Sequence, residues 1–211
     1  MAAARAHQAD GTAGPGGEEA PRAFRQAVAA LAGVRTRPEV RLGPLPPPRR
    51  LAPFAHAVEA SVEAGGEELA DGRFVLLHDP AGQEAWRGSF RVVTLARAQL
   101  EPEMAGDPLL PEVSWSWLTG ALEARSAGYA AEGGTVTRAD SHSFGELADR
   151  AVRSELEIRA SWTPREGSGD AAAGHLAAWC DLLCQCAGLP PEEGEGAAVV
   201  PLPQRRGPQP L

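Results

Sequence analysis

The segment ELEIRASW, residues 155–162, constrains the fold more than any other part of this sequence. Leu156, Ile158, Ala160 and Trp162 alternate with Glu155, Glu157, Arg159 and Ser161. This period of two predicts a strand with one face in an apolar core and the other in water. Half-buried strands of this kind are typical of antiparallel sheets, because the strands of parallel sheets are covered on both faces.

Four further segments have the properties of strands. Residues 88–100 are rich in β-branched side chains, and Phe74–Leu77 form a short apolar run. Asp79-Pro80-Ala81-Gly82 matches the residue preferences of a type I turn after that run. Residues 133–144 are a fourth candidate. Residues 54–63 alternate as in a strand but also permit a helix, and we favour a strand because it forms a hairpin with the next one.

Three segments are expected to be helical. Pro21 begins the first, which ends near Gly33. Residues 112–127 place Trp115, Leu118 and Leu122 on one face, whereas Trp117 points elsewhere. The third begins with Asp170 as N-cap and runs through residue 187, with Trp179 in its apolar stripe.

The order of these elements predicts an α+β fold in a single domain. We expect an antiparallel sheet of about five strands with the two Trp-bearing helices packed on one face. A shift of 62 residues superimposes Gly72 on Gly134, Arg97 on Arg159 and Trp117 on Trp179. This raises the hypothesis of a duplicated strand-strand-helix unit. The expected organisation is a disordered stretch 1–20, an N-terminal helix with a Pro/Arg-rich arm at 21–50, a core domain at 51–190 and a disordered tail at 191–211.

Cysteine usage and hydropathy indicate a cytoplasmic protein. The three cysteines, Cys180, Cys184 and Cys186, fall within seven residues, which is a poor disulfide framework. Their C-x3-C-x-C spacing lacks the second ligand pair of a zinc site, so buried, inert thiols are expected. No signal peptide and no run of 18 apolar residues is present, so we expect no contact with a membrane.

The stretch from Gln99 to Leu122 combines four carboxylates, three prolines and two tryptophans without a basic residue. Glu101, Glu103 and Asp107 do not follow the spacing of a calcium loop. Asp107 can instead cap a turn, and Pro111 can occupy the first turn of the helix that follows. We interpret the stretch as a stiff entry to a core helix, with protein docking as its next most favoured role.

No catalytic constellation, metal site or cofactor motif is evident. His78 and Asp79 resemble an acid–base pair, but the turn chemistry already explains Asp79, and no nucleophile elbow accompanies them. If a ligand site exists, we expect it in a cleft between the sheet and the Trp-bearing helices. The polar and aromatic candidates for such a site are His78, Asp79, Glu84, Arg97, Glu101, Glu103, Asp107 and Trp117.

Charge is distributed unevenly along the chain. Residues 21–50 hold seven arginines and one acid, for a local charge of +6, whereas residues 51–211 hold twelve arginines and 24 acids, for −12. A basic, proline-stiffened arm can dock a protein partner, fold back on the acidic body or contact nucleic acid. The arm lacks stacking aromatics, which disfavours nucleic acid. The arginines assigned to a partner arm are Arg35, Arg37, Arg41, Arg49 and Arg50.

Several blocks together resemble the actinobacterial domain-of-unknown-function family numbered 3000. They are LLHDPAGQEAW (76–86), LEPEMAGDPLLPEVSWSWL (100–118), GGTVT (133–137), LEIRASWTP (156–164) and HLAAWCDLLCQCAGLPP (175–191). The likeness covers about residues 22–191. It implies a cytoplasmic protein of an actinobacterium and supplies no reaction, cofactor or catalytic residue.

Three functional hypotheses follow from the sequence. The favoured one is a non-enzymatic interaction or adaptor protein that docks a protein partner through the Arg/Pro arm and the acidic 99–112 edge. The second is a small-molecule-binding protein or enzyme with its cleft between the sheet and the Trp-bearing helices. The third is weak contact with nucleic acid through the arm.

Overall fold

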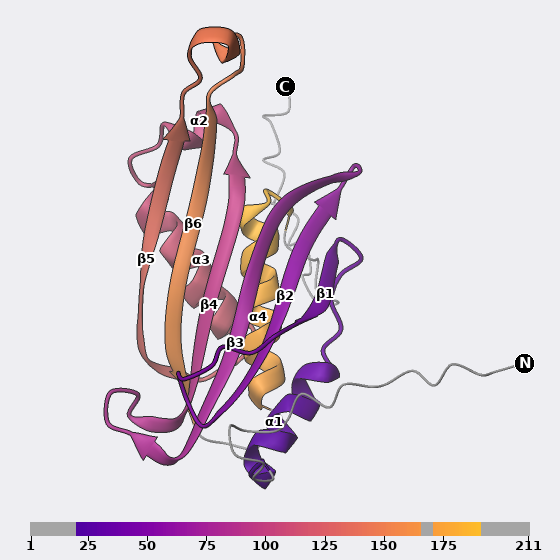
Figure 1. The fold of residues 1–211 in the computed structure, drawn as a ribbon, viewed down its shortest axis with the longest axis vertical. Helices are drawn as coiled ribbons and strands as arrows, with labels where there is room; N and C mark the ends of the chain where they lie inside the picture. The colour runs from indigo at the N-terminus through magenta and orange to yellow at the C-terminus, as the bar shows by residue number, and fades with distance from the viewer. Residues whose placement is uncertain (1–19, 166–170, 191–211) are drawn as a thin grey trace, which may run out of the picture.

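The fold is built on one antiparallel sheet of six strands. The computed structural model describes residues 20–165 and 171–190, and the sheet has the order β1-β2-β3-β4-β6-β5 (Figure 1). Its strands are β1 (Val40–Leu45), β2 (Phe54–Ala64), β3 (Glu67–Gln83), β4 (Gly88–Leu100), β5 (Tyr129–Ser141) and β6 (Arg153–Pro164). The predicted α+β fold with an antiparallel sheet is therefore confirmed.

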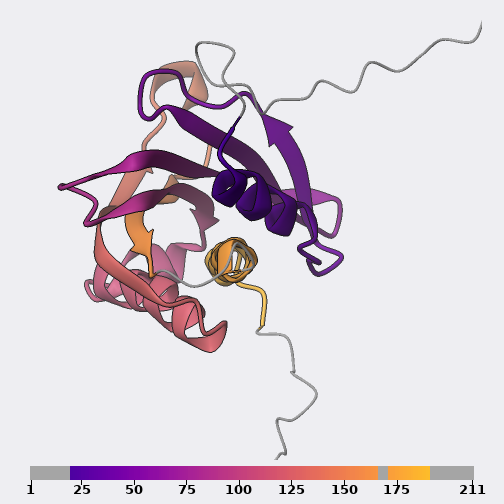
Figure 2. The same ribbon diagram turned by 90° about the horizontal axis from the view of Figure 1, so that it is seen from below.

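Three longer helices cover one face of this sheet and leave the other face without a helix (Figures 1 and 2). They are α1 (Arg22–Ala32), α3 (Leu110–Ala124) and α4 (Ala171–Cys186). A short helix, α2 (Pro102–Ala105), precedes α3, and the 3₁₀ turn η1 (Gly145–Leu147) lies in the β5–β6 hairpin. The face without a helix is called the open face below.

The alternation in β6 works as the sequence predicts. Leu156, Ile158, Ala160 and Trp162 are buried, and the residues between them are partly or fully exposed. Thr163, which follows Trp162, is also buried. The buried face of β6 joins that of β4, because the two strands are antiparallel neighbours with Ala96 opposite Ile158. Between this face and α4 lies the core, in which Trp162, Trp179 and Phe74 are the largest side chains without solvent contact.

Part of the predicted Pro/Arg-rich arm belongs to the sheet and does not project from the domain. Residues 40–45 form the edge strand β1, paired with β2, and this sixth strand was not predicted. The remaining arm residues, 46–50, and the first residues of the predicted core domain, 51–53, cross the open face over β3 and β4 (Figures 1 and 2). Local sequence did not reveal β1 because Pro44 removes a backbone donor, which an edge strand tolerates and a central strand does not.

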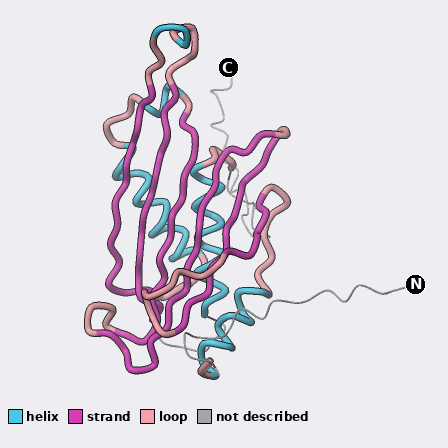
Figure 3. The backbone as a smooth tube through the Cα atoms, viewed as in Figure 1, coloured by secondary structure: helices cyan, strands magenta, loops and turns pink. Residues whose placement is uncertain are grey.

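Two further local predictions are resolved by the sheet. Residues 54–64 are a strand, as favoured. The type I turn predicted at 79–82 is wrong, because β3 continues through these residues and the chain reverses at residues 84–87 (Figure 3). Asp79 still acts locally, since its carboxylate accepts a hydrogen bond from the amide of Ala81 at 3.0 Å. The predicted N-cap Asp170 and nearly all of the predicted disordered ends lie outside the described residues.

The order of elements repeats along the chain, in keeping with the hypothesis of a duplicated unit. The unit β3-β4-α3 is followed by β5-β6-α4, and the shift of 62 residues carries each element of the first onto its counterpart. The same shift maps Ala96 onto Ile158, and these two residues face each other across the β4–β6 pair. The two hairpins are thus joined about a local two-fold axis between β4 and β6.

Each Trp-bearing helix packs on the strand of the other unit, at a glycine. A Cβ atom added to Gly72 on β3 would lie 2.7 Å from Cζ2 of Trp179 on α4. A Cβ atom added to Gly134 on β5 would lie 2.7 Å from Cζ3 of Trp115 on α3. The two glycines therefore allow the indole rings to lie directly against the sheet, and the helices are exchanged between the two units.

We expect Gly72→Ala and Gly134→Ala each to lower the free energy of unfolding by about 1–3 kcal/mol, because the added methyl group overpacks a rigid contact. Urea denaturation followed by tryptophan fluorescence measures this loss. Gly120→Ala is the matched control, because it lies in α3 with no atom within 4 Å of the added Cβ. That control should stabilise the helix by ~0.8 kcal/mol; equal effects at the three positions would contradict the close approach.

Candidate functional site

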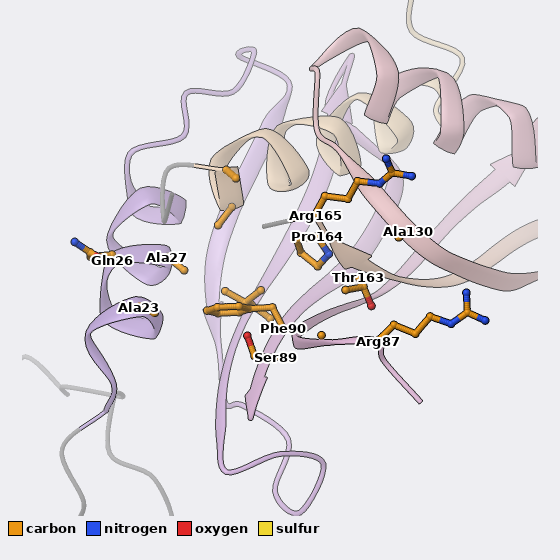
Figure 4. Close-up of a pocket in the computed structure, with 14 residues that line it drawn as sticks. Ala23, Gln26, Ala27, Arg87, Ser89, Phe90, Ala130, Thr163, Pro164 and Arg165 are labelled. Atoms are coloured by element: carbon orange, nitrogen blue, oxygen red, sulfur yellow. The ribbon is translucent and has the colours of Figure 1, made fainter. Parts of the chain in front are cut away.

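A cavity of about 550 Å³ opens between α1, the first turn of α4 and the adjoining ends of β4 and β6 (Figure 4). It lies on the helix-covered side of the sheet, where α1 and α4 pack against each other. We call it the α1–α4 pocket. Its apolar lining comes from Ala23, Ala27, Leu76, Phe90, Ala130, Pro164, Ala171 and Ala172, and its polar lining from Gln26, Arg87, Ser89, Thr163 and Arg165, with Gly88 between.

The pocket exists because the two helices present small side chains to each other. On α1, Phe24 and Leu31 fill the core, whereas Ala23 and Ala27 face the pocket. On α4, the residues at the pocket are Ala171 and Ala172. Of the five helical residues in the lining, four are alanines and the fifth is Gln26, so the two helices leave a volume that the neighbouring side chains do not fill.

Phe90 forms the inner wall of the pocket and is held by an aromatic cluster. Its ring stacks on the imidazole of His78 with a centroid distance of 4.2 Å, and His78 also stacks on Phe24 at 5.9 Å. The Nδ1–H group of His78 donates a hydrogen bond to the carbonyl oxygen of Ser89 at 3.0 Å. Burial lowers the pKa of His78, so the ring is held neutral as part of the wall.

Some polar groups at the rim already have hydrogen-bond partners within the protein, and others can still bind a ligand. The hydroxyl group of Thr163 donates to the carbonyl oxygen of Trp86 and accepts from Arg91, so it is already satisfied. Arg165 donates through Nε to the carbonyl oxygen of Tyr129 at 2.8 Å. Neither Arg165 nor Arg87 forms an ion pair with a carboxylate among the described residues. The rim therefore carries two arginines that form no ion pair within the described chain, with Glu123 and Glu132 lining an adjoining hollow together with Arg165.

Figure 4 shows how these groups are arranged. Phe90 points toward α1, where Ala23 and Ala27 lie, and the side chains of Arg87 and Arg165 extend on the other side, near Ala130. The site thus has an apolar part between the helices and a cationic part at the start of β5. An arrangement of this kind accommodates a molecule with an apolar body and an anionic end.

A buried histidine on α4 lies one turn beyond the pocket lining. The indole Nε1–H of Trp162 donates to His175 Nδ1 at 3.1 Å, which places the imidazole proton on Nε2. Neither Nε2 of His175 nor Nε1 of Trp179, one turn further, has a hydrogen-bond partner among the described residues. Burial lowers the pKa of His175 to about 4.

This histidine makes the fold sensitive to acid. Its folded pKa is below the unfolded value of about 6.5, so the unfolded chain binds more protons and stability falls as the pH drops from 6.5 to 4. The contribution is about 3 kcal/mol at 1.4 kcal/mol per pKa unit. In His175→Gln, which keeps an acceptor for Trp162, we expect this part of the pH dependence to vanish. Urea midpoints between pH 4 and 7 test it, and parallel profiles would contradict it.

The eight residues that the sequence offered for a ligand cleft do not gather in the α1–α4 pocket. His78 lies behind its wall, whereas Glu84, Glu101 and Asp107 are exposed. Arg97 lies on the open face in an ion pair with Glu157 at 3.0 Å. Asp79 is partly buried beyond the His78 end of β3, Trp117 is partly buried on α3, and Glu103 lies in α2.

The carboxylate-rich stretch behaves as a structural entry to α3. The amide of Leu109 donates to the carboxylate of Asp107 at 2.8 Å, and Pro111 lies in the first turn of the helix. Leu118 and Leu122 are buried on the core face, as predicted. Trp115 is only partly buried, because it lies at the flank of the helix against Gly134.

The arginines of the predicted partner arm divide into two groups. Arg37 pairs with Glu39 at 3.1 Å, and Arg41 pairs with Glu63 at 2.9 Å. These two are therefore neutralised by acids of this chain. Arg35, Arg49 and Arg50 are exposed, the last two in the segment that crosses the open face.

The cysteine cluster is buried and reduced. Cys180, Cys184 and Cys186 are all free thiols in the interior face of α4. Burial raises the pKa of Cys180 and of Cys186 to about 12, so little thiolate forms at neutral pH. No group of three or more potential ligands that could hold a metal occurs among the described residues.

We expect none of the three thiols to react with a thiol-specific disulfide reagent at pH 8 in the folded protein, and all three to react in 6 M guanidinium chloride. Spectrophotometric counting of the released thiolate distinguishes the two states. Rapid labelling of a cysteine in the folded protein would show that α4 opens readily.

Sequence reasoning missed the pocket for identifiable reasons. Phe90 carries an apolar signal like that of any core strand, and Arg87 and Arg165 are two of many arginines in the chain. The only local hint is the Ala-rich surface of the two helices at 23–30 and 171–173, which predicts that those faces leave space. Which strand ends adjoin them is decided by the sheet.

The sequence matches a family described as "Protein of unknown function (DUF3000)" over residues 20–196. The chain belongs to this family. The match includes every residue of the α1–α4 pocket and all six strands. No curated protein and no solved structure matches the chain. None of the helices among the described residues is both long and apolar enough to cross a membrane.

Proposed function

We propose that this DUF3000 protein binds a small amphipathic anion in the α1–α4 pocket. The observation that supports this most is the combination of an apolar cavity with two arginines at one side, Arg87 and Arg165, that form no ion pair among the described residues. A volume of about 550 Å³ is within the range of about 300–1,000 Å³ found for small-molecule sites.

The apolar part of the ligand would supply most of the binding free energy. Burial of apolar surface contributes about 25 cal/mol per Å², and Phe90, Leu76 and the alanines offer little else than such contacts. The pocket is largely built before the ligand arrives, because Phe90 is fixed by the stack with His78. A preformed site loses less conformational entropy on binding.

The charged end of the ligand follows from the chemistry of the rim. Guanidinium groups bind carboxylates and phosphates through paired N–H donors. They also remain protonated at neutral pH and do not exchange protons with a substrate. Since no described lining residue is a carboxylate or an imidazole, the proposal is one of binding and not of acid–base catalysis.

The proposal places the protein in the cytoplasm. Three reduced, buried thiols in one helix support this location, because unpaired cysteines are typical of a reducing compartment. A cytoplasmic amphipathic anion of the proposed kind is a carboxylate or phosphate on a short apolar chain.

The test compares dodecanoate with dodecan-1-ol as probes in isothermal titration calorimetry. Arg87→Gln combined with Arg165→Gln should weaken dodecanoate about tenfold, which corresponds to ~1.4 kcal/mol, and leave dodecanol unchanged. Ala27→Phe should weaken both probes, because the larger side chain fills the apolar part of the cavity.

Arg150→Gln is the matched control for charge, because Arg150 is exposed in the β5–β6 hairpin and does not line the pocket. It should bind both probes like the wild type. If neither probe binds the wild type, or if Ala27→Phe binds both unchanged, the α1–α4 pocket is not the site and the proposal fails.

A further inference from the structure

The open face of the sheet carries a groove of about 560 Å³ with three arginines in its lining. They are Arg73 on β3, Arg97 on β4 and Arg159 on β6. No helix of the described chain covers this face (Figures 1 and 2). The groove is therefore separate from the α1–α4 pocket, which lies on the opposite side of the sheet.

Strand register places these groups in rows across the sheet. Arg73 is opposite Leu95, and Leu95 is opposite Arg159, so two arginines flank a leucine in one row. The adjacent row, two residues along each strand, contains Val75, Val93 and Ser161 and has no charge. A small, mostly apolar floor thus runs across the strands beside a cationic wall.

The positive charge of this face is only partly balanced. The carboxylate of Glu157 forms ion pairs with two arginines, Arg97 at 3.0 Å and Arg159 at 2.7 Å. Arg73 forms no ion pair with a carboxylate in the described part of the chain. The residues that line the groove include three arginines and no carboxylate, whereas Glu59 lies opposite Arg73, and Asp71 and Glu157 lie opposite Arg97, at its border.

Arg91 lies next to the uncharged row, and partial burial of its charged guanidinium costs desolvation free energy. Its guanidinium donates to Ser161 Oγ at 2.7 Å, to Thr163 Oγ1 at 3.1 Å and to the carbonyl oxygen of Ala131 at 2.8 Å. All three acceptors are neutral. Burial lowers the pKa of Arg91, and its guanidinium forms no ion pair with a carboxylate among the described residues. An anionic group bound nearby would offset this cost.

The crossing segment adds two more arginines to the same face. Residues 46–53 pass over β3 and β4 on the open side, and Arg49 and Arg50 in this segment are exposed. The outward-facing side chain of Leu77 is buried although no helix covers it, which is in keeping with this crossing. The segment is rich in proline, so it holds a defined course at low entropic cost.

We infer that the open face docks an extended, acidic segment of a protein partner, with carboxylates along the cationic wall and small apolar side chains on the floor. Arg73 and Arg159 are two strands apart, or about 10 Å. A peptide in the extended polyproline II conformation rises about 3.1 Å per residue with three residues per turn, so acidic residues three positions apart lie on one face about 9 Å apart. Valine or alanine between the acids would contact the apolar row formed by Val75 and Val93.

A peptide fits this face better than a nucleic acid does. Glu155, Glu157 and Asp71 lie among the arginines and would repel a continuous phosphate backbone. The described residues that line the groove include no aromatic side chain on which bases could stack. A peptide with acids at intervals avoids the carboxylates and uses the apolar row.

The experiment measures fluorescence anisotropy of a labelled, capped peptide of twelve residues with Glu at every third position and Val or Ala between. The full-length protein should bind it, and binding should weaken at least tenfold between 50 and 300 mM NaCl. Two probes serve as comparisons. One is a peptide of the same composition with its glutamates clustered at one end, and the other is a single-stranded dT12 oligonucleotide.

The variant Arg73→Glu/Arg159→Glu should reduce affinity for the spaced peptide at least tenfold, and Arg49→Ala/Arg50→Ala should reduce it several-fold. Arg150→Glu, in the distant hairpin, is the matched control and should bind as the wild type does. Titration with dodecanoate verifies that each variant is folded, because the α1–α4 pocket is on the other side of the sheet. Thermal unfolding provides the same check if dodecanoate does not bind.

Three results would overturn the inference. They are absence of binding to the spaced peptide, an equal loss of affinity in Arg150→Glu, and tighter binding of the clustered peptide or of dT12 than of the spaced peptide. Each of these concerns the open face only and leaves the amphipathic-anion proposal to its own test.

Discussion

The packing of α4 against the middle of the sheet is the contact on which the rest of the structure depends. Ten of the sixteen residues of this helix are buried, and it contacts α1, α3 and strands β2, β3, β4 and β6. Its approach is set by the indole of Trp179, which lies on Gly72 where a methyl group would collide. Because α4 packs against both other long helices of the described chain, its distance from the sheet fixes the positions of α1 and α3.

The α1–α4 pocket follows from that arrangement. α1 is held against α4 and the aromatic cluster of Phe24, Phe54 and His78, so it cannot move inward to close the gap. The alanines of the facing helices leave the volume, and Phe90 provides a rigid wall. Arg87 and Arg165 reach the rim from a hairpin and a strand end, where long side chains keep their charged ends in solvent.

The two faces of the sheet carry different chemistry for the same structural reason. The helix-covered face buries its side chains, so it tolerates polar groups only where they are satisfied or neutral, as with His78 and His175. The open face keeps its charges in water and can present arginines in rows. One sheet thus carries the α1–α4 pocket, which we propose binds an amphipathic anion, on one side, and the arginine-lined groove, which we propose docks a peptide, on the other.

The sequence by itself determined the local elements with strong periodicity. The alternation in 155–162, the β-branched run at 88–100 and the apolar stripes that include Leu118 and Leu183 are all found in the expected strands and helices. Local chemistry also predicted that the cysteines are buried free thiols and that the carboxylate of Asp107 caps a turn. Such features can be predicted from the sequence because they depend mainly on residues that are close together in the chain.

Only the tertiary structure decided the edge strand β1, the reversal at residues 84–87 and the two sites. β1 lies against β2 because pairing with a long neighbour outweighs the weak propensity of a Pro- and Gly-containing segment. The α1–α4 pocket joins residues from 23 to 172, and the groove joins four strands, β3, β4, β5 and β6, from two hairpins. Local sequence cannot specify such sites, because it does not encode which distant surfaces meet or how much space remains between them.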